Sequence, residues 1–176
     1  MKILPLTFRF ATYAMLALFS PWAVAQTCVA GTQPSNPTSI YVISSATVTD
    51  SRTGLMWDRC ELGLSGPDCA TGTTNLFSWQ GALDAAATVG TYKGYNDWRL
   101  PNLKELRSLV EECRRDPSIN EIAFPNTSVF VSIFWSSSPT AGYAAYSRFV
   151  SFKSGSGGGF GSHSAAYRIR LVRAGQ

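Results

Sequence analysis

The chain has 176 residues and a formal net charge of +4. Two of its basic residues lie in an N-terminal signal, and without them the charge falls to +2, so the basic isoelectric point overstates the character of the remaining chain. What remains has the size of one ordinary domain and contains no collagen-like Gly-X-Y stretch, and its nearly balanced charge gives no reason to expect a nucleic-acid partner.

The first 25 residues have the three parts of a secretory signal peptide. Lys2 and Arg9 supply positive charge, an apolar run follows, and Ala23-Val24-Ala25 forms a small-residue cleavage site. The apolar run is too short to favour a stable membrane span. We therefore expect an exported protein, in the periplasm, on the outer cell surface or outside the cell. Its predicted parts are a signal peptide (1–25), an extended segment with a first strand (26–47) and one domain (48–176).

The N-terminal part of the exported chain is predicted to be extended and then β. Residues 31–39 contain two prolines among small polar residues, which favours an extended segment. Residues 40–48 are rich in β-formers, and residues 55–57 form a second short apolar strand after the turn at 50–54. We expect these two strands to pair as a hairpin.

Two helices are predicted near the middle of the chain. The first covers about residues 78–89, because its body is rich in alanine and Gly90 can end it. The second covers about residues 103–113, where Asn102 can cap the helix and Glu105 can complete a capping box. Neither is long enough for a coiled-coil stem.

The C-terminal third is predicted to be β. Residues 129–138 and 145–152 can form strands, residues 155–161 supply a glycine-rich turn, and residues 167–173 form the last strand. In this last strand Tyr167, Ile169 and Leu171 alternate with basic residues, so the apolar set can face a core while Arg168 and Arg170 lie side by side on the other face.

All four cysteines lie in the exported part: Cys28, Cys60, Cys69 and Cys113. An oxidising compartment makes two disulfides the expected state. Three pairings are formally possible, and the short spacing favours Cys60 with Cys69, which leaves Cys28 for Cys113. A zinc site lacks closely paired cysteines and has only one histidine to help, so no metal is expected.

Five motifs give the chain a family resemblance. They are Thr53-Gly54-Leu55-Met56-Trp57, Tyr95-Asn96-Asp97-Trp98-Arg99-Leu100-Pro101-Asn102, Ala123-Phe124-Pro125-Asn126-Thr127, Phe134-Trp135-Ser136-Ser137-Ser138 and Arg170-Leu171-Val172-Arg173. In this order they resemble the DUF1566 family, which is also named for the C-terminal domain of the Legionella collagen-like adhesin, Lcl. By themselves, Trp98 and Arg99 are interpreted as residues that organise the fold.

The order of elements predicts a mixed α+β domain, with two central helices packed on short, mainly antiparallel sheets. This order is similar to the C-type lectin-like fold and to its formylglycine-generating-enzyme branch. That branch depends on a cysteine pair in its C-terminal region, whereas no cysteine follows Cys113 here. The triplets that bind calcium in lectins are also absent, and His163 has no carboxylate near it in sequence. We therefore expect no catalytic residue and no cofactor.

The candidate ligand site comes from an uneven distribution of charge. No carboxylate side chain follows Glu121, and the last third contains five predicted ligand-binding cations: Arg148, Lys153, Arg168, Arg170 and Arg173. Arginine binds sulfate and carboxylate groups through two parallel hydrogen bonds. Tyr143 and Tyr146 are the aromatic residues that we expect to be free to stack on sugar rings. The alternative is a solvated strand face whose charges only prevent edge pairing.

The resemblance implies a binding function, because the Lcl C-terminal domain is implicated in adhesion to sulfated polysaccharides through the basic surface of a trimer. The sequence thus predicts a non-catalytic module that binds an anionic polysaccharide or another cell-surface ligand, and that could form a homo-oligomer. The alternatives are a structural envelope module that assembles with itself or a partner protein, and an enzyme related to the formylglycine-generating enzymes.

Overall fold

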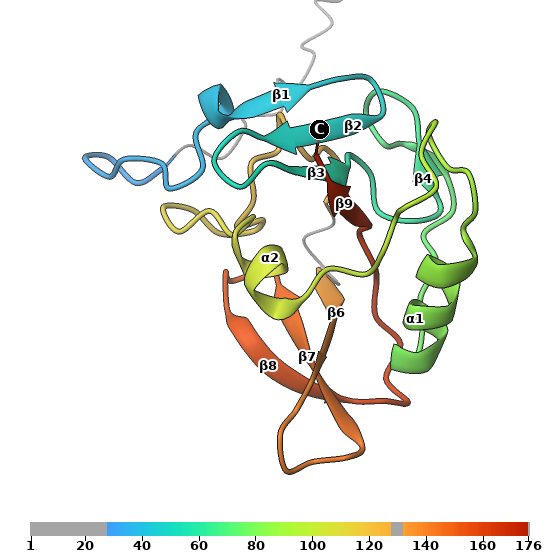
Figure 1. The fold of residues 1–176 in the computed structure, drawn as a ribbon. Coiled ribbons are helices and arrows are strands. Elements are labelled where there is room, and N and C mark those ends of the chain that lie inside the picture. Colours follow the sequence, from blue (N-terminus) through green and yellow to red (C-terminus); the bar gives the residue numbers. More distant parts are fainter. Residues whose placement is uncertain (1–27, 128–131, 176) are drawn as a thin grey trace, which may run out of the picture.

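The computed structural model describes residues 28–127 and 132–175, which form a mixed α+β structure with short helices beside antiparallel sheets (Figure 1). The predicted signal peptide lies outside these residues. The helices are a 3-10 turn (Thr38–Ile40), α1 (Trp79–Thr88) and α2 (Leu103–Arg107). The strands are β1 (Tyr41–Ile43), β2 (Thr47–Asp50), β3 (Leu55–Asp58), β4 (Leu64–Ser65), β5 (Thr71–Gly72), β6 (Ile133–Pro139), β7 (Tyr146–Ser151), β8 (Gly157–Ser162) and β9 (Val172–Ala174).

The first sheet has the strand order β1-β2-β3-β9, with every pair antiparallel. The prediction of one strand over residues 40–48 is wrong, because this segment folds back on itself as the hairpin β1-β2. Ser44 explains the break: its hydroxyl accepts a hydrogen bond from the Thr47 amide at 3.0 Å, and its own amide donates to the Thr47 carbonyl at 2.9 Å. A serine side chain bound in this way stabilises a turn in place of a continuous strand.

The end of the chain completes the first sheet, as β9 pairs with β3. This strand is shorter than the predicted 167–173. Before β9, the chain runs through the interior and makes only isolated bridges, between Tyr167 and Phe77 and between Arg168 and Phe134. This segment has neighbours on both sides, since Ile169 and Leu171 belong to one core cluster and Arg170 lies over Phe124 on the other side.

Both helices begin where the sequence predicts. The Ser78 hydroxyl caps α1 by accepting from the Gly81 amide, and Asn102 and Glu105 form the full capping box of α2. The second helix ends at Arg107 and not near residue 113, so its predicted length is wrong. The following residues pair with a later segment instead: Val110 forms a bridge with Ile119, and the Glu111 amide donates to the Ser118 carbonyl at 2.9 Å.

Strands β4 and β5 form a small two-stranded sheet of their own. The second large sheet, called the second sheet below, has the order β6-β7-β8, and α2 packs against it. Its third strand lies where the sequence predicts a glycine-rich turn. The glycines of β8 allow close packing: a Cβ atom at Gly159 would lie 2.4 Å from the Phe149 ring, and one at Gly161 would lie 2.7 Å from the Tyr167 ring. The strand can therefore approach these aromatic rings only without side chains.

Two apolar clusters and two disulfides hold these layers together. One cluster packs the first sheet against α2 and the second sheet, and the other packs α1 against β6 and the segment before β9. The disulfides are Cys28–Cys113 and Cys60–Cys69, which confirms the favoured pairing. Within the described part of the chain, no helix has the length and apolarity needed to cross a membrane.

Candidate functional site

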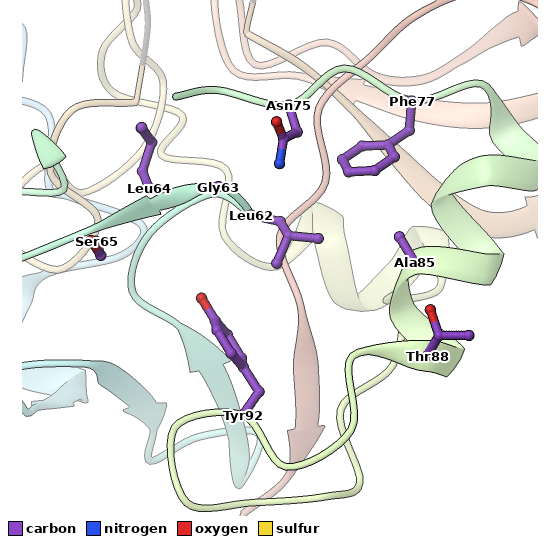
Figure 2. Close-up of a pocket in the computed structure, with 9 residues that line it drawn as sticks. All are labelled: Leu62, Gly63, Leu64, Ser65, Asn75, Phe77, Ala85, Thr88 and Tyr92. Carbon is purple, nitrogen blue, oxygen red and sulfur yellow. The ribbon is translucent and has the colours of Figure 1, made fainter. Parts of the chain in front are cut away.

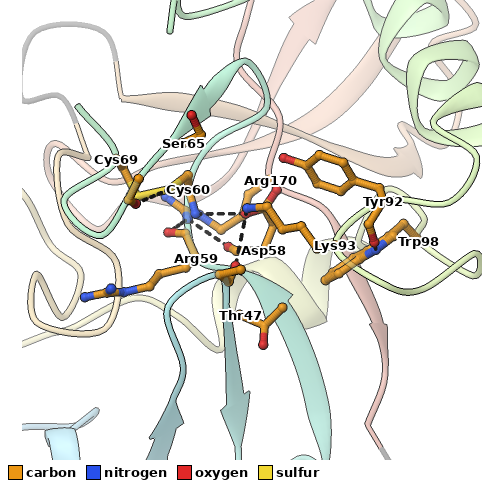
Figure 3. A network of polar contacts seen from close by, with 12 residues as sticks. Thr47, Asp58, Arg59, Cys60, Ser65, Cys69, Tyr92, Lys93, Trp98 and Arg170 are labelled. Atoms are coloured by element: carbon orange, nitrogen blue, oxygen red, sulfur yellow. Dashed lines mark hydrogen bonds and ion pairs between the residues drawn. A yellow bond between two sulfur atoms is a disulfide. The ribbon is translucent and has the colours of Figure 1, made fainter. Parts of the chain in front are cut away.

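Arg170, one of the five predicted ligand-binding cations, is completely buried. Its guanidinium donates to the carbonyl oxygens of Asp58 (3.0 Å) and Arg59, as Figure 3 shows. It also donates to the Thr127 hydroxyl at 3.2 Å. The ring of Phe124 lies 4.9 Å from the guanidinium carbon. Burial lowers the pKa of Arg170 to about 10, so the group still carries its charge at neutral pH.

Arg168 is paired with Glu61. One guanidinium nitrogen of Arg168 lies 2.6 Å from both carboxylate oxygens, and the two side chains are 12% and 3% exposed. This pair attracts an anionic ligand only weakly, because the Glu61 carboxylate neutralises the Arg168 guanidinium in a region that water barely reaches.

Arg173 is also buried, at 4% exposure. Its guanidinium donates to Asp97 at 2.6 Å and lies 4.0 Å above the centre of the Tyr95 ring. The Arg173 guanidinium holds the pKa of the Asp97 carboxyl below its usual value. Tyr95 and Asp97 belong to the aromatic motif before α2, so this contact joins that motif to β9.

The prediction that Arg168, Arg170 and Arg173 form an exposed basic face is therefore wrong. The prediction that the apolar residues of this segment face a core is correct for Ile169 and Leu171, which are buried. The other side is buried as well, because the segment runs between two layers. The carboxylates and carbonyl groups that bind these arginines come from residues 58–61 and 97, far away in sequence.

Lys153 is exposed but separate from the other predicted residues. Lys153 comes just after the C-terminal end of β7, where its carbonyl accepts a hydrogen bond from the Asp116 amide at 2.9 Å. Tyr146 lies at the opposite end, as the first residue of that strand. Strand residues advance by about 3.3 Å each, so β7 separates the two side chains by roughly 20 Å.

Tyr143 and Tyr146 are brought together with Phe160, which the sequence reading missed. We call these three residues the aromatic platform. Their exposed fractions are 59%, 38% and 54%. The rings of Tyr143 and Phe160 are stacked, with centres 6.0 Å apart and planes 11° from parallel, and the Tyr146 ring meets both edge-on. Isolated exposed aromatic residues are ordinary, but three in mutual contact form a continuous apolar surface.

The backbone fixes the platform in place. Phe160 pairs across the sheet with Arg148, and Tyr146 pairs with Ser162, so Tyr146 and Phe160 are diagonal neighbours on one face. Two hydrogen bonds hold the turn that carries Tyr143, from the Tyr143 amide to Thr140 (3.1 Å) and from the Tyr146 amide to Tyr143 (3.0 Å). The rings are thus arranged before any ligand arrives.

Arg148 is the predicted cation that lies beside the platform. It is directly opposite Phe160, is half-buried, and donates to the Gly158 carbonyl at 2.5 Å. Arg107 of α2 reaches β8, the strand of Phe160, since a Cβ atom at Gly157 would lie 2.5 Å from its side chain. Within residues 28–127 and 132–175, neither arginine forms an ion pair with a carboxylate. The platform therefore borders a cationic region.

His163 packs against neighbouring elements of the domain. Its ring is half-buried, stacks on Trp79 with centres 4.4 Å apart, and shares a 2.8 Å hydrogen bond with the Ser147 hydroxyl. Ser147 has no exposed surface, so a substrate cannot reach its hydroxyl. The hydrogen bond between Ser147 and His163 joins β7 to the segment after β8, so His163 contributes to packing.

One group of potential metal ligands occurs in the described part of the chain, formed by Cys28, Glu111 and Cys113. The two sulfur atoms are bonded to each other, so neither is a thiolate. Glu111 instead accepts hydrogen bonds from the amides of Ser35 (2.8 Å) and Asn36 (2.9 Å). These residues thus attach the N-terminal segment to the domain.

Three residues that were not predicted, Phe160, Glu61 and Arg107, differ in how far the sequence could have indicated their roles. Phe160 is a lone aromatic residue among glycines and serines, and its position suggested a turn. Glu61 could not be identified as the partner of Arg168, because 107 residues separate the two in the chain. Arg107 lies on the second predicted helix, and nothing in the sequence indicates that this helix packs beside β8.

Comparison with protein families agrees with the motifs. Residues 46–173 match the Lcl C-terminal domain, which is not a known enzyme family. No curated protein matches the sequence. Because the matched region covers well over half of its length, the chain belongs to the Lcl C-terminal domain family.

Proposed function

We propose that the protein is an exported, non-catalytic binding module of the adhesin type, with a C-type lectin-like architecture, that recognises an anionic polysaccharide. The family supports an adhesin-like surface module, and the two disulfides are typical of an extracytoplasmic location. The ligand binds at the aromatic platform and at Arg148, and the buried Arg168, Arg170 and Arg173 keep a structural role. The single observation that carries this proposal is the contact among Tyr143, Tyr146 and Phe160 on the surface.

The chemistry of a polysaccharide fits this surface. The C–H face of a pyranose ring is apolar and packs on an aromatic ring, while sulfate or carboxylate groups along the chain accept hydrogen bonds from arginine. Arg148 is next to Phe160 in the sheet, so one ligand can contact both. The second sheet contributes no carboxylate, since no Asp or Glu follows Glu121. An anionic chain therefore meets little local repulsion.

The test is a titration with heparin as the sulfated probe and dextran as the neutral probe. Replacing both Tyr143 and Phe160 with Ala should weaken heparin binding by roughly 10-fold or more, since each ring contributes about 0.5–1.5 kcal/mol beyond its area. Arg148→Ser should weaken binding and reduce its dependence on salt. Ile122→Ala is the control, because Ile122 is 61% exposed and lies outside the platform. Equal heparin affinity for the platform variant and the Ile122 control would refute the proposal.

A self-assembly module is the second candidate, and the same platform favours it. Exposed apolar surfaces are also typical of protein–protein contacts. If the platform joins two copies, sedimentation should show a dimer or larger species that Tyr143→Ala with Phe160→Ala dissociates, and heparin should bind no better to the wild type than to that variant.

A further inference from the structure

A cavity that is wide open to solvent lies between α1 and the segment around β4, and its lining residues are distant in sequence from the platform. Its volume is about 540 Å³, within the range of small-ligand sites. Figure 2 shows its walls: the Tyr92 ring forms one side, Phe77 and Asn75 lie on the opposite side, Leu62 is between them, and Ala85 of α1 closes a third side. Nothing in the proposed function uses these residues.

The cavity is built from uncharged groups. Its walls are mostly apolar, and no described residue that lines it carries a charged side chain. The Asn75 carboxamide is exposed and has no hydrogen-bond partner within the described ranges, so it offers one acceptor and two donor hydrogens. A charged ligand would find no ionic partner among these lining residues, whereas a neutral ligand with an amide or hydroxyl group can exchange hydrogen bonds with the carboxamide.

Gly63 keeps this arrangement open. Its φ is +102°, and a Cβ atom there would lie 2.3 Å from the Thr73 carbonyl and 2.9 Å from the Asn75 side-chain nitrogen. Only glycine adopts this conformation without strain and leaves the carboxamide in its position. The floor of the cavity and the placement of Asn75 therefore depend on the same residue.

Tyr92 provides a fixed aromatic wall. Its carbonyl accepts from the Trp98 indole at 2.7 Å, and its backbone forms two hydrogen bonds with Tyr95. Burial, together with the carboxylate of Asp58, raises the pKa of the Tyr92 phenol, so the hydroxyl stays neutral. Lys93 binds Asp58 and the Ala46 carbonyl and thereby holds the adjoining residue in place (Figure 3).

We propose that this cavity binds one uncharged, N-acetylated sugar residue. The pyranose ring packs against Tyr92, the acetyl methyl group enters the apolar part near Leu62 and Phe77, and the acetamido group exchanges hydrogen bonds with the Asn75 carboxamide. The absence of charged lining residues selects against uronic acids and sulfated sugars. This site and the platform share no residue, so each can fail experimentally without the other.

The experiment is a titration of the mature protein with N-acetylglucosamine, glucose and glucuronate, followed by NMR. We expect saturable binding of N-acetylglucosamine with a Kd on the order of 1 mM, and weaker binding of the other two sugars. Ala85→Leu fills the cavity and should abolish binding. Ala87→Leu is its matched control, since Ala87 is exposed on the same helix and does not line this cavity. Asn75→Ala, at an exposed position that should not affect folding, should remove the preference for N-acetylglucosamine over glucose.

The proposal is overturned if N-acetylglucosamine shows no saturation up to about 50 mM. It is also overturned if Ala85→Leu and Ala87→Leu bind the sugar equally well, or if Asn75→Ala retains the preference. The variant with Tyr143→Ala and Phe160→Ala should bind N-acetylglucosamine like the wild type. That result distinguishes failure of the platform from failure of this cavity.

Discussion

At the scale of single residues, the arginines of the C-terminal segment show how charge can stabilise an interior. Arg170 has no carboxylate among its hydrogen-bond partners, which are two carbonyl groups and a hydroxyl. Aromatic rings cover it on two sides, with Phe124 at 4.9 Å and Phe134 at 5.6 Å. The planar guanidinium suits such a site, because it stacks on rings while donating in its own plane.

Replacing Arg170 with Ser should therefore reduce stability and leave heparin binding to the folded protein unchanged. The change leaves buried carbonyl groups without donors and opens a cavity, so we expect a loss of roughly 3 kcal/mol in the free energy of unfolding. Urea unfolding followed by tryptophan fluorescence measures this loss. Lys153→Ser, at an exposed site, should change stability by less than about 0.5 kcal/mol. Equal unfolding midpoints for the two variants would contradict the structural role of Arg170.

At the scale of elements, β8 shows where pattern reading from sequence stops. Glycine-rich segments are usually turns, because glycine lacks a Cβ and allows positive φ angles. Here the missing Cβ atoms serve packing, since Gly161 faces the rings of Tyr167 and Trp135. The sequence does not say which rings will approach a strand, so this element could not have been identified from periodicity alone.

The packing role of β8 predicts different effects for two of its glycines. Gly161→Ala should destabilise the protein by about 1–3 kcal/mol, because the added Cβ atom would lie 2.7 Å from the Tyr167 ring and 2.9 Å from the Trp135 ring. Gly157→Ala is the matched control, since the three atoms nearest to its Cβ atom belong to the Arg107 side chain, which is exposed and can move. Thermal unfolding of both variants measures the difference. A larger loss for Gly157→Ala would show that the rings move more easily than the arginine.

The helices show the opposite case, in which local signals were sufficient. The first helix begins at the predicted position, where Ser78 caps it, and the Asn102–Glu105 pair caps α2 as predicted, because capping depends on residues within one turn. The end of α2 depends on Ile119, which pairs with Val110. Likewise Tyr143 and Tyr146 were identified as free aromatic residues, while their contact with Phe160 required the register of β7 and β8. In both cases a segment outside the local sequence supplied the partner, whereas the distant pairing of Cys28 with Cys113 was predicted because cysteines form disulfides only with each other.

At the scale of the whole molecule, the N-terminal segment is held to the domain by one covalent and several polar contacts. Cys28 is bonded to Cys113, and Glu111 accepts from the amides of Ser35 and Asn36. Burial alone would raise the pKa of Glu111, but these hydrogen bonds outweigh it and hold the pKa below its usual value. The ionised carboxylate is thus the form that the fold prefers.

This preference predicts a pH dependence. A lowered pKa in the folded state gives stability that is complete above the unfolded pKa of about 4.5 and is lost as the pH falls through the folded value. Glu111→Gln should cost roughly 1–3 kcal/mol at pH 7, and this cost should shrink as the pH falls below about 4.5. Urea unfolding at several pH values gives the comparison, with the exposed Glu112→Gln as control. A Glu111→Gln cost that stays constant with pH would rule out the ionised form as its source.

The position of the Cys28–Cys113 bridge gives the molecule two distinct ends. In Figure 1 the segment after Cys28 lies in the upper half, whereas the β6–β7 loop that carries Tyr143 lies at the bottom. A ligand bound at the three exposed rings would therefore approach the end of the molecule opposite to the one where the N-terminal segment is held.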